Sequence, residues 1–166
     1  MTVQPDAEPP ALIPLTDAAS AGLAAERRPL TRLPFRVGRD LRSPGRQRLR
    51  WFRERRRGGT GPNDVYLAET TSPHRISRQH FLIGFDPETH SFFLEDRASS
   101  CGTQVGEARI GGDRRGGRRV LRHGDVIRPG GAHSPFAFRF VLPGRKGGSD
   151  GGDRPTPELG APRDRI

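Results

Sequence analysis

Short apolar segments separated by turn residues constrain the fold of this chain more than any other feature of its sequence. Each segment has the length of a β-strand, and turn-forming residues such as Gly, Pro and Asp punctuate the sequence between them. In the last segment Phe136, Phe138, Phe140 and Leu142 recur at every second position, which places them on one face of a strand. Long amphipathic helical patterns are absent from the sequence, so an all-β fold is predicted, an antiparallel β-sandwich. The strand candidates are Ala11–Leu15, Leu33–Val37, Val65–Leu67, Phe81–Phe85, Ser91–Glu95, Thr103–Val105, Ala108–Ile110, Val120–Leu121, Val126–Arg128 and Phe136–Leu142.

Three stretches of different composition interrupt or flank this pattern. Residues 1–10 are polar and rich in proline, and residues 143–166 are rich in Gly, Pro and charge, so both are predicted to be disordered tails. Residues 41–62 are dense in arginine and end in Gly-Gly and Gly-Pro pairs, which predicts a long loop. One domain, residues 11–142, contains this Arg-rich loop and all the strand candidates.

The chain carries a formal net charge of +10, from 29 basic and 19 acidic residues. This balance favours anionic partners, namely nucleic acid, a phosphorylated peptide or an acidic membrane surface. Codon usage in a GC-rich genome explains the excess equally well, because Lys146 is the only lysine and arginine supplies the rest.

Simple counts exclude several classes of site. Cys101 is the only cysteine, so neither an internal disulfide nor a zinc site built from cysteines can form. His74, His90, His123 and His133 are scattered without the spacing of metal ligands, and no metal or cofactor is expected.

The first residues lack the basic and apolar stretches of a signal peptide, and no apolar run approaches the roughly 18 residues of a membrane span. We therefore expect a cytoplasmic protein.

Four polar, glycine-containing clusters lie at the ends of strand candidates: Gly38-Arg39, Ser77–His80, Asp96–Thr103 and Leu121–Ile127. In order and spacing they resemble the forkhead-associated (FHA) domain, whose pattern is Gly-Arg, Ser-x-x-His, Asp-x-x-Ser-x-Asn-Gly-Thr and Leu-x-x-Gly-Asp-x-Ile. The resemblance covers roughly residues 11–142. It implies a sandwich of about eleven strands with binding loops at one end, and recognition of phosphothreonine.

The chemistry of phosphothreonine agrees with that implication. Its phosphate carries about −1.5 to −2 charges and three acceptor oxygens, so a site needs a guanidinium and short hydroxyl donors. The resemblance assigns the phosphate to Arg39 and Ser77 with help from Ser100, while Arg78 adds positive charge. The residues expected to support the site structurally are Gly38, His80, Gly102 and Thr103.

Ser77 and His80 do not predict a nucleophile and its base. A separation of three residues at a strand entrance does not orient the imidazole onto its neighbour, and no acid that would orient the imidazole is evident. We therefore expect no enzymatic activity.

The chain departs from the family pattern at Cys101, where the pattern has Asn. An Asn amide offers a donor and an acceptor to the backbone of the bound peptide, and a thiol replaces it poorly. Asn also tolerates a left-handed backbone better than Cys does. We therefore expect phosphate capture to persist while the peptide contact of Cys101 is weaker.

The leading prediction is a phosphothreonine-peptide-binding adaptor in serine/threonine kinase signalling. One alternative is a polyanion or nucleic-acid binder that uses the Arg-rich loop, with Trp51 and Phe52 stacking on bases. Another is a degenerate FHA scaffold that has lost phosphate binding through Cys101. The Arg-rich loop would also serve to extend the site toward an acidic partner, although a solvated run of charge is the simpler explanation.

Overall fold

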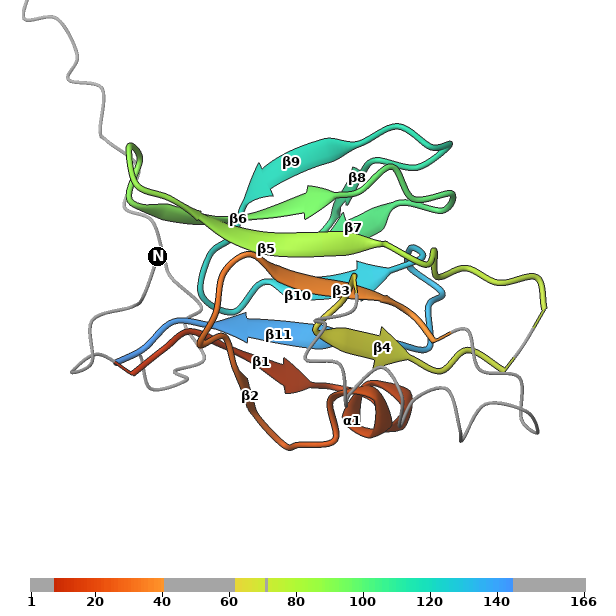
Figure 1. Ribbon diagram of the computed structural model, residues 1–166, viewed down its shortest axis with the longest axis horizontal. Helices are drawn as coiled ribbons and strands as arrows, with labels where there is room; N and C mark the ends of the chain where they lie inside the picture. The colour runs from red at the N-terminus through yellow and green to blue at the C-terminus, as the bar shows by residue number, and fades with distance from the viewer. Residues whose placement is uncertain (1–7, 41–61, 71, 145–166) are drawn as a thin grey trace, which may run out of the picture.

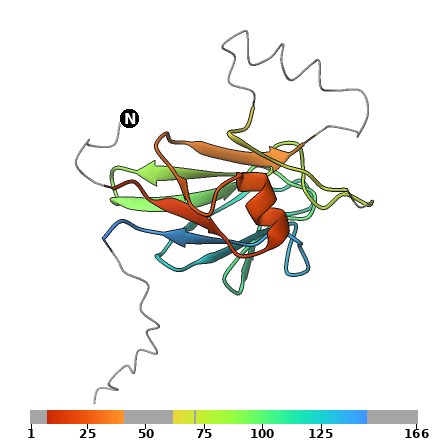
Figure 2. The ribbon, with the colours of Figure 1, turned by 90° about the horizontal axis from the view of Figure 1, so that it is seen from below.

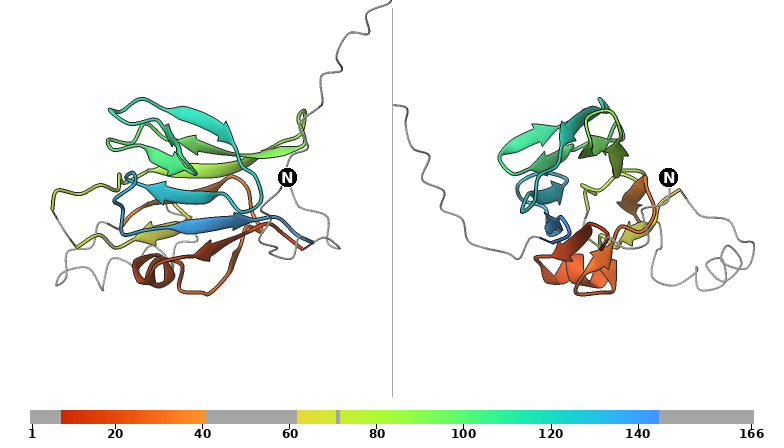
Figure 3. Two further views of the ribbon diagram at one scale, coloured as in Figure 1. Left: turned by 180° about the vertical axis from the view of Figure 1, so that it is seen from behind. Right: turned by 90° about the vertical axis from the view of Figure 1, so that its left-hand side faces the viewer.

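The computed structural model describes residues 8–40, 62–70 and 72–144 (Figure 1). In this part of the chain eleven strands form two sheets, with the orders β2-β1-β11-β10-β7-β8 and β4-β3-β5-β6-β9. Figure 3 shows the sheets as two layers of a sandwich, which confirms the predicted fold class and strand number. The strands are β1 (Ala11–Pro14), β2 (Arg28–Pro29), β3 (Phe35–Arg39), β4 (Val65–Leu67), β5 (Phe81–Asp86), β6 (Ser91–Asp96), β7 (Thr103–Val105), β8 (Ala108–Ile110), β9 (Gly117–Val120), β10 (Val126–Pro129) and β11 (Phe138–Val141).

The core lies between the two sheets and is apolar. The predicted alternation near the C-terminal end holds within β11, because Phe138 and Phe140 are buried while Arg139 between them is exposed. It does not extend to Phe136, because Ala137 is buried as well as Phe136. Side chains of both sheets meet in one cluster whose members include Leu12, Val37, Ile83, Leu94, Ile127 and Phe140. Burying this apolar surface is the main term that favours folding.

Seven of the ten predicted strands have shifted limits. Four differ by one residue at one end, and the last strand is observed at Phe138–Val141 rather than at Phe136–Leu142. The other two differ by more. The segment predicted at Leu33–Val37 is β3, and it runs on to Arg39 because its last three residues pair in parallel with β4. The segment predicted at Val120–Leu121 is the end of β9, whose polar residues Arg118 and Arg119 pair with β6. The prediction used apolar residues, and an exposed edge strand has few of them.

No element was predicted between residues 16 and 32, where the structure has the helix α1 (Asp17–Leu23) and β2. The hydroxyl of Thr16 caps the helix by accepting a hydrogen bond from the Ala19 N–H at 3.3 Å. The helix packs with buried Ala19 and Leu23 at the edge where β1 of one sheet approaches β4 of the other (Figure 2). Seven residues are too few to produce the long amphipathic pattern for which the sequence was searched.

The folded part of the chain begins before Ala11. Pro10 is buried, and its carbonyl oxygen accepts a hydrogen bond from the Leu30 N–H at 2.8 Å. Residues 1–7 of the predicted N-terminal tail, residues 41–61 of the Arg-rich loop and residues 145–166 of the predicted C-terminal tail lie outside the described residues.

Candidate functional site

The order of strands in the second sheet brings three chain segments together at one end of the sandwich. Phe81, the first residue of β5, pairs with Val37 near the end of β3 and with Asp96 at the end of β6. The loop that precedes β5 therefore lies between Arg39, which ends β3, and the loop that follows β6. All the residues predicted to form the site are on these three segments.

Ser77 is the residue on which the three segments converge. Its carbonyl oxygen accepts a hydrogen bond from the Arg39 N–H at 2.9 Å, and its hydroxyl oxygen accepts one from the Ser100 N–H at 3.1 Å. Its own N–H donates to His80 Nδ1 at 2.9 Å. Since the Ser77 oxygen acts as acceptor here, the hydroxyl hydrogen stays available to a ligand. Within the described residues the half-buried Arg39 has no side-chain hydrogen bond or ion pair.

His80 holds the Ser77 loop to the β6–β7 loop. The ring is fully buried, and its Nε2 lies 3.0 Å from the Gly102 carbonyl oxygen. Because Nδ1 accepts the Ser77 N–H, the ring proton belongs on Nε2, which donates to Gly102. The Gly130 N–H donates to the same carbonyl at 2.8 Å. Burial lowers the pKa of His80 below its ordinary value, so the neutral ring that these bonds require is favoured.

The β6–β7 loop is shaped by the buried carboxylate of Asp96. Its Oδ1 accepts the Ser99 N–H, and its Oδ2 accepts the hydroxyls of Ser99 and Thr103, each at 2.8 Å. The Ser99 hydroxyl oxygen in turn accepts the Gly102 N–H at 2.8 Å. Asp96 is the last residue of β6, as expected from the sequence, and its side chain also has the central place in this network. Four hydrogen bonds thus fix the turn that carries Ser100.

Gly38 is required by space rather than by an unusual backbone angle. A Cβ at this position would overlap the carbonyl oxygen of Arg78 and lie 2.5 Å from Asn63 Nδ2.

Two further side chains brace the loop before β5. Asn63 Nδ2 donates to the Arg78 carbonyl oxygen at 2.7 Å, and Arg97 Nη2 donates to Gln79 Oε1 at 2.6 Å. Asn63 and Arg97 were not singled out in the sequence, because their partners come from distant segments.

The remaining predicted site residues are less constrained. Arg78 and Ser100 are exposed, and Cys101 is a half-buried free cysteine. The left-handed residues of the β6–β7 loop are Ala98 (φ 56°) and Gly102 (φ 72°), not Cys101. The expectation that Asn would suit the backbone of this turn better than Cys is therefore wrong.

The described residues contain no group of three or more His, Cys, Asp or Glu side chains that could hold a metal ion. Among the same residues no helix is both long and apolar enough to cross a bilayer.

Comparison with known proteins places this geometry in a family. A model of the FHA domain matches residues 35–130, more than half of the chain. Comparison with curated protein sequences finds no match. Full-length yeast Pml1p is similar in structure, with 20% sequence identity and a TM-score of 0.54 over 84% of this chain and 85% of that chain. The FHA-1 domain of Mycobacterium tuberculosis Rv1747 is 22% identical, with a TM-score of 0.48 over 82% of this chain and 99% of that one.

A further similar structure is Mycobacterium tuberculosis EmbR in complex with a low-affinity phosphopeptide, at 19% identity and a TM-score of 0.48. The match covers 84% of this chain and 26% of EmbR, so the chain spans about a quarter of that protein. The match of the FHA model to most of the sandwich, including all three segments of the site, shows that this chain belongs to the FHA-domain family.

Proposed function

We propose that this chain is a phosphothreonine-peptide-binding adaptor that docks a phosphorylated protein and catalyses no reaction. The observation that carries the proposal is the arrangement around Ser77. Because Ser77 is hydrogen-bonded to the backbones of both Arg39 and Ser100, three residues that carry one guanidinium and two hydroxyls are held as neighbours at the backbone. Membership of the FHA-domain family supports the same ligand class.

The three side chains match the needs of a phosphate monoester. Arg39 supplies a planar guanidinium for bidentate contact, and the hydroxyls of Ser77 and Ser100 are donors for the remaining oxygens. Arg78 adds exposed positive charge from the same loop. Since hydrogen bonds already fix the backbones of Ser77 and Ser100, little ordering of these loops is needed on binding, which favours affinity.

The position of His80 supports a role in binding rather than catalysis. Its Nδ1 accepts the backbone N–H of Ser77, and its Nε2 faces the carbonyl of Gly102. Neither ring nitrogen is directed at the Ser77 hydroxyl, so the imidazole is not placed to activate that hydroxyl as a nucleophile.

A phosphothreonine ligand implies that a serine/threonine kinase acts upstream, and we place the adaptor in such a signalling route in the cytoplasm. The methyl group of phosphothreonine is expected to favour it over phosphoserine by about 1–3 kcal/mol at most.

The proposal is tested by titrating fluorescent peptides that differ only in carrying phosphothreonine, phosphoserine or threonine, selected from a library randomised around that residue. Arg39→Ala is expected to weaken phosphothreonine binding by about 2–5 kcal/mol, the typical effect of removing one partner of a close charge pair. The control Arg139→Ala removes the same charge from an exposed position on β11 and should bind normally. Unchanged affinity in a folded Arg39→Ala variant, or equal binding of the unphosphorylated peptide, would contradict the proposal.

The nucleic-acid alternative concerns residues 41–61, which lie outside the described part of the chain, and it stays a prediction. Replacing Arg53, Arg55, Arg56 and Arg57 with Ser should reduce the salt dependence of association without changing the preference for phosphate. Loss of that preference would instead make the Arg-rich loop part of the primary site.

A further inference from the structure

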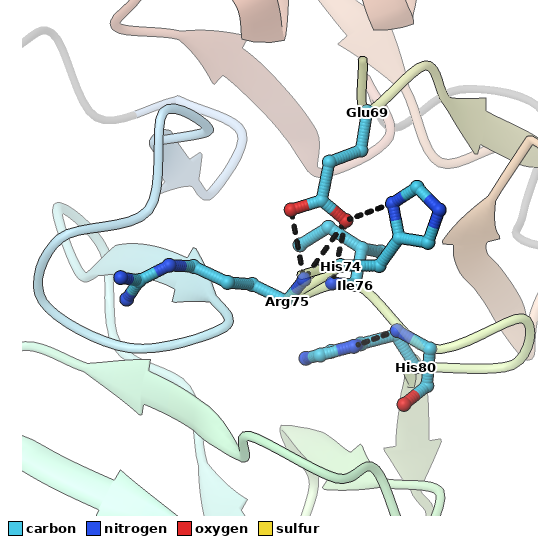
Figure 4. Close-up of polar contacts among 6 residues, drawn as sticks. Glu69, His74, Arg75, Ile76 and His80 are labelled. Atoms are coloured by element: carbon cyan, nitrogen blue, oxygen red, sulfur yellow. Dashed lines mark hydrogen bonds and ion pairs between the residues drawn. The ribbon is translucent and has the colours of Figure 1, made fainter. Parts of the chain in front are cut away.

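Glu69 is a half-buried residue that no motif in the sequence marks, and its carboxylate is turned into the protein. It stands two residues after β4, and its side chain is 2% exposed. Figure 4 shows the carboxylate facing the imidazole of His74 and the backbone nitrogens of Arg75 and Ile76. Its Oε1 accepts the Arg75 N–H at 2.8 Å, and its Oε2 accepts the N–H groups of Arg75 at 2.9 Å and Ile76 at 3.0 Å. The imidazole of His74 lies beside it, with Nδ1 3.7 Å from Oε2.

Side chains bind three consecutive backbone N–H groups in the loop before β5. Glu69 accepts those of Arg75 and Ile76, and His80 accepts that of Ser77. Hydrogen bonds to a charged acceptor are about twice as strong as those between neutral groups. Glu69 and His80 together therefore fix the path along which the chain reaches Ser77.

Glu69 also connects this loop to the strand that carries Arg39. Leu67, at the end of β4, pairs in parallel with Arg39, and its carbonyl oxygen accepts the Asp40 N–H at 2.8 Å. The chain continues from Leu67 to Glu69, whose carboxylate then bonds to the Ser77 loop. The relative position of Arg39 and Ser77 thus depends on this short link as well as on the direct bond between their backbones.

On its other side the same loop contacts the segment after β10. A Cβ on Gly130 would lie 2.9 Å from the Cβ of Arg75, so the two backbones are in close approach. The Gly130 N–H donates to the carbonyl of Gly102, in the β6–β7 loop. A change in the path of residues 75–77 would therefore be transmitted to the loop that carries Ser100.

We propose that Glu69 is the positioning residue of the phosphate site: it holds the Ser77 hydroxyl beside Arg39 and Ser100 without touching the ligand. This inference rests on the proposed function. The charge of Glu69 distinguishes positioning from a direct electrostatic effect. A nearby carboxylate repels phosphate, so neutralising it would strengthen binding if electrostatics dominated, whereas loss of positioning weakens binding.

The test is Glu69→Gln, which keeps the shape of the side chain but replaces one acceptor oxygen with an NH₂ donor that faces backbone N–H groups. We expect the affinity for a phosphothreonine peptide to fall about tenfold or more. The control Glu88→Gln removes the same charge from an exposed position in the turn between β5 and β6 and should bind as the wild type does. Unchanged or tighter binding by Glu69→Gln would overturn the proposal.

A measurement without ligand separates this proposal from the proposed function. Amide hydrogen exchange of Ser100 reports the bond from its N–H to the Ser77 hydroxyl oxygen, on a loop that Glu69 does not contact through any hydrogen bond of the described residues. Glu69→Gln should accelerate exchange at Ser77 and Ser100 while leaving Leu94 in β6 protected. Unchanged exchange at Ser100 would contradict positioning even if the wild-type protein bound phosphopeptides.

If Glu69→Gln does not fold, Glu69→Asp takes its place. Asp keeps the charge and both oxygens but is shorter by one methylene. Glu69→Asp should therefore weaken phosphothreonine-peptide binding and accelerate exchange at Ser77 and Ser100, both to a smaller extent than Glu69→Gln. Wild-type affinity and wild-type exchange at Ser100 in this variant would overturn the proposal.

Discussion

The two ends of the sandwich are held by different kinds of interaction. At the end that carries Arg39, Ser77 and Ser100, the loops are bonded to buried polar side chains. Five of the six buried polar or charged residues in the described part of the chain serve this end, namely Asn63, His80, Asp96, Ser99 and Thr103. At the opposite end lies the turn between β5 and β6, whose side-chain contacts are exposed to solvent (Figure 1). Asp86 Oδ2 lies 3.3 Å from Arg118 Nη2, and the hydroxyl oxygens of Thr89 and Ser91 are 2.7 Å apart.

This difference indicates which end has a function beyond connecting strands. Burying a polar group is unfavourable unless it is hydrogen-bonded, and no buried side-chain nitrogen or oxygen in the described residues lacks a partner. A turn that only reverses the chain does not need such groups, as the β5–β6 hairpin shows. The buried network fixes loop positions in advance, which is what a preformed binding site requires.

Replacing one aspartate at each end should give the largest difference between the ends, measured as the loss in the free energy of unfolding. Asp96→Ala leaves the Ser99 N–H and the hydroxyls of Ser99 and Thr103 without their acceptor, and each buried unsatisfied group costs about 1–3 kcal/mol. We expect the free energy of unfolding to fall by about 3 kcal/mol or more. Asp86→Ala, at the exposed end, should lower it much less. Urea denaturation of both variants tests this, and equal losses would mean that the network does not stabilise the fold.

A glycine at each end provides the next comparison. Gly38→Ala places a methyl group against the Arg78 carbonyl, and such overpacking costs about 1–3 kcal/mol. Gly106 has open space around it but a φ of 58°, so Gly106→Ala should cost about 1 kcal/mol through backbone strain alone. Only Gly38→Ala should also weaken phosphopeptide binding. A titration in which both variants bind like the wild type would show that Gly38 does not set the site geometry.

The buried histidine makes stability depend on pH in a predictable direction. Burial lowers the pKa of His80 in the folded state below its ordinary value of 6.5. As pH falls through 6.5 the unfolded chain takes up the proton first, so the contribution of His80 is complete above that pH and is lost on acidification. Since one proton is involved, the free energy of unfolding can change by at most about 1.4 kcal/mol per pH unit.

Thermal or urea unfolding at several pH values between 5 and 8 measures this slope. His80→Gln should flatten it, while His133→Gln, which changes an exposed histidine, should leave it as in the wild type. A slope that persists in His80→Gln would assign the acid sensitivity to another group.

The smallest expected effect is at Cys101. Cys101→Asn introduces a side-chain donor and acceptor, each worth roughly 0.5–1.5 kcal/mol net if it meets the peptide backbone. We expect binding to tighten several-fold and the melting temperature to stay unchanged, because Cys101 is not in the left-handed region. If neither peptide affinity nor stability changed, Cys101 would not face the ligand. If stability rose without detectable binding, a scaffold without phosphate binding would be the better account.

The fold class could be predicted from the sequence because strand periodicity is a local signal. That Arg39, Ser77 and Ser100 lie at one end of the sandwich was expected from the resemblance of the four short clusters to the FHA pattern. The sequence did not reveal Glu69, Asn63 or the role of Asp96. The partners of Glu69 and Asn63 are backbone groups, which have no sequence signature, and the pair Asn63 and Arg78 is 15 residues apart. The helix α1 was missed because it is short, and only the end of the edge strand β9 was predicted because its polar residues Arg118 and Arg119 give no apolar pattern.

The central claim, that the Arg39, Ser77 and Ser100 end binds phosphothreonine, is tested most directly by amide chemical shifts during titration with a phosphothreonine peptide and its unphosphorylated counterpart. We predict saturable shifts at Ser77 and Ser100 with the phosphorylated peptide, none with the unphosphorylated one, and none at Glu88 and Thr89 of the opposite end. Equal shifts with both peptides, or shifts at the β5–β6 turn without any at Ser77 and Ser100, would contradict the claim.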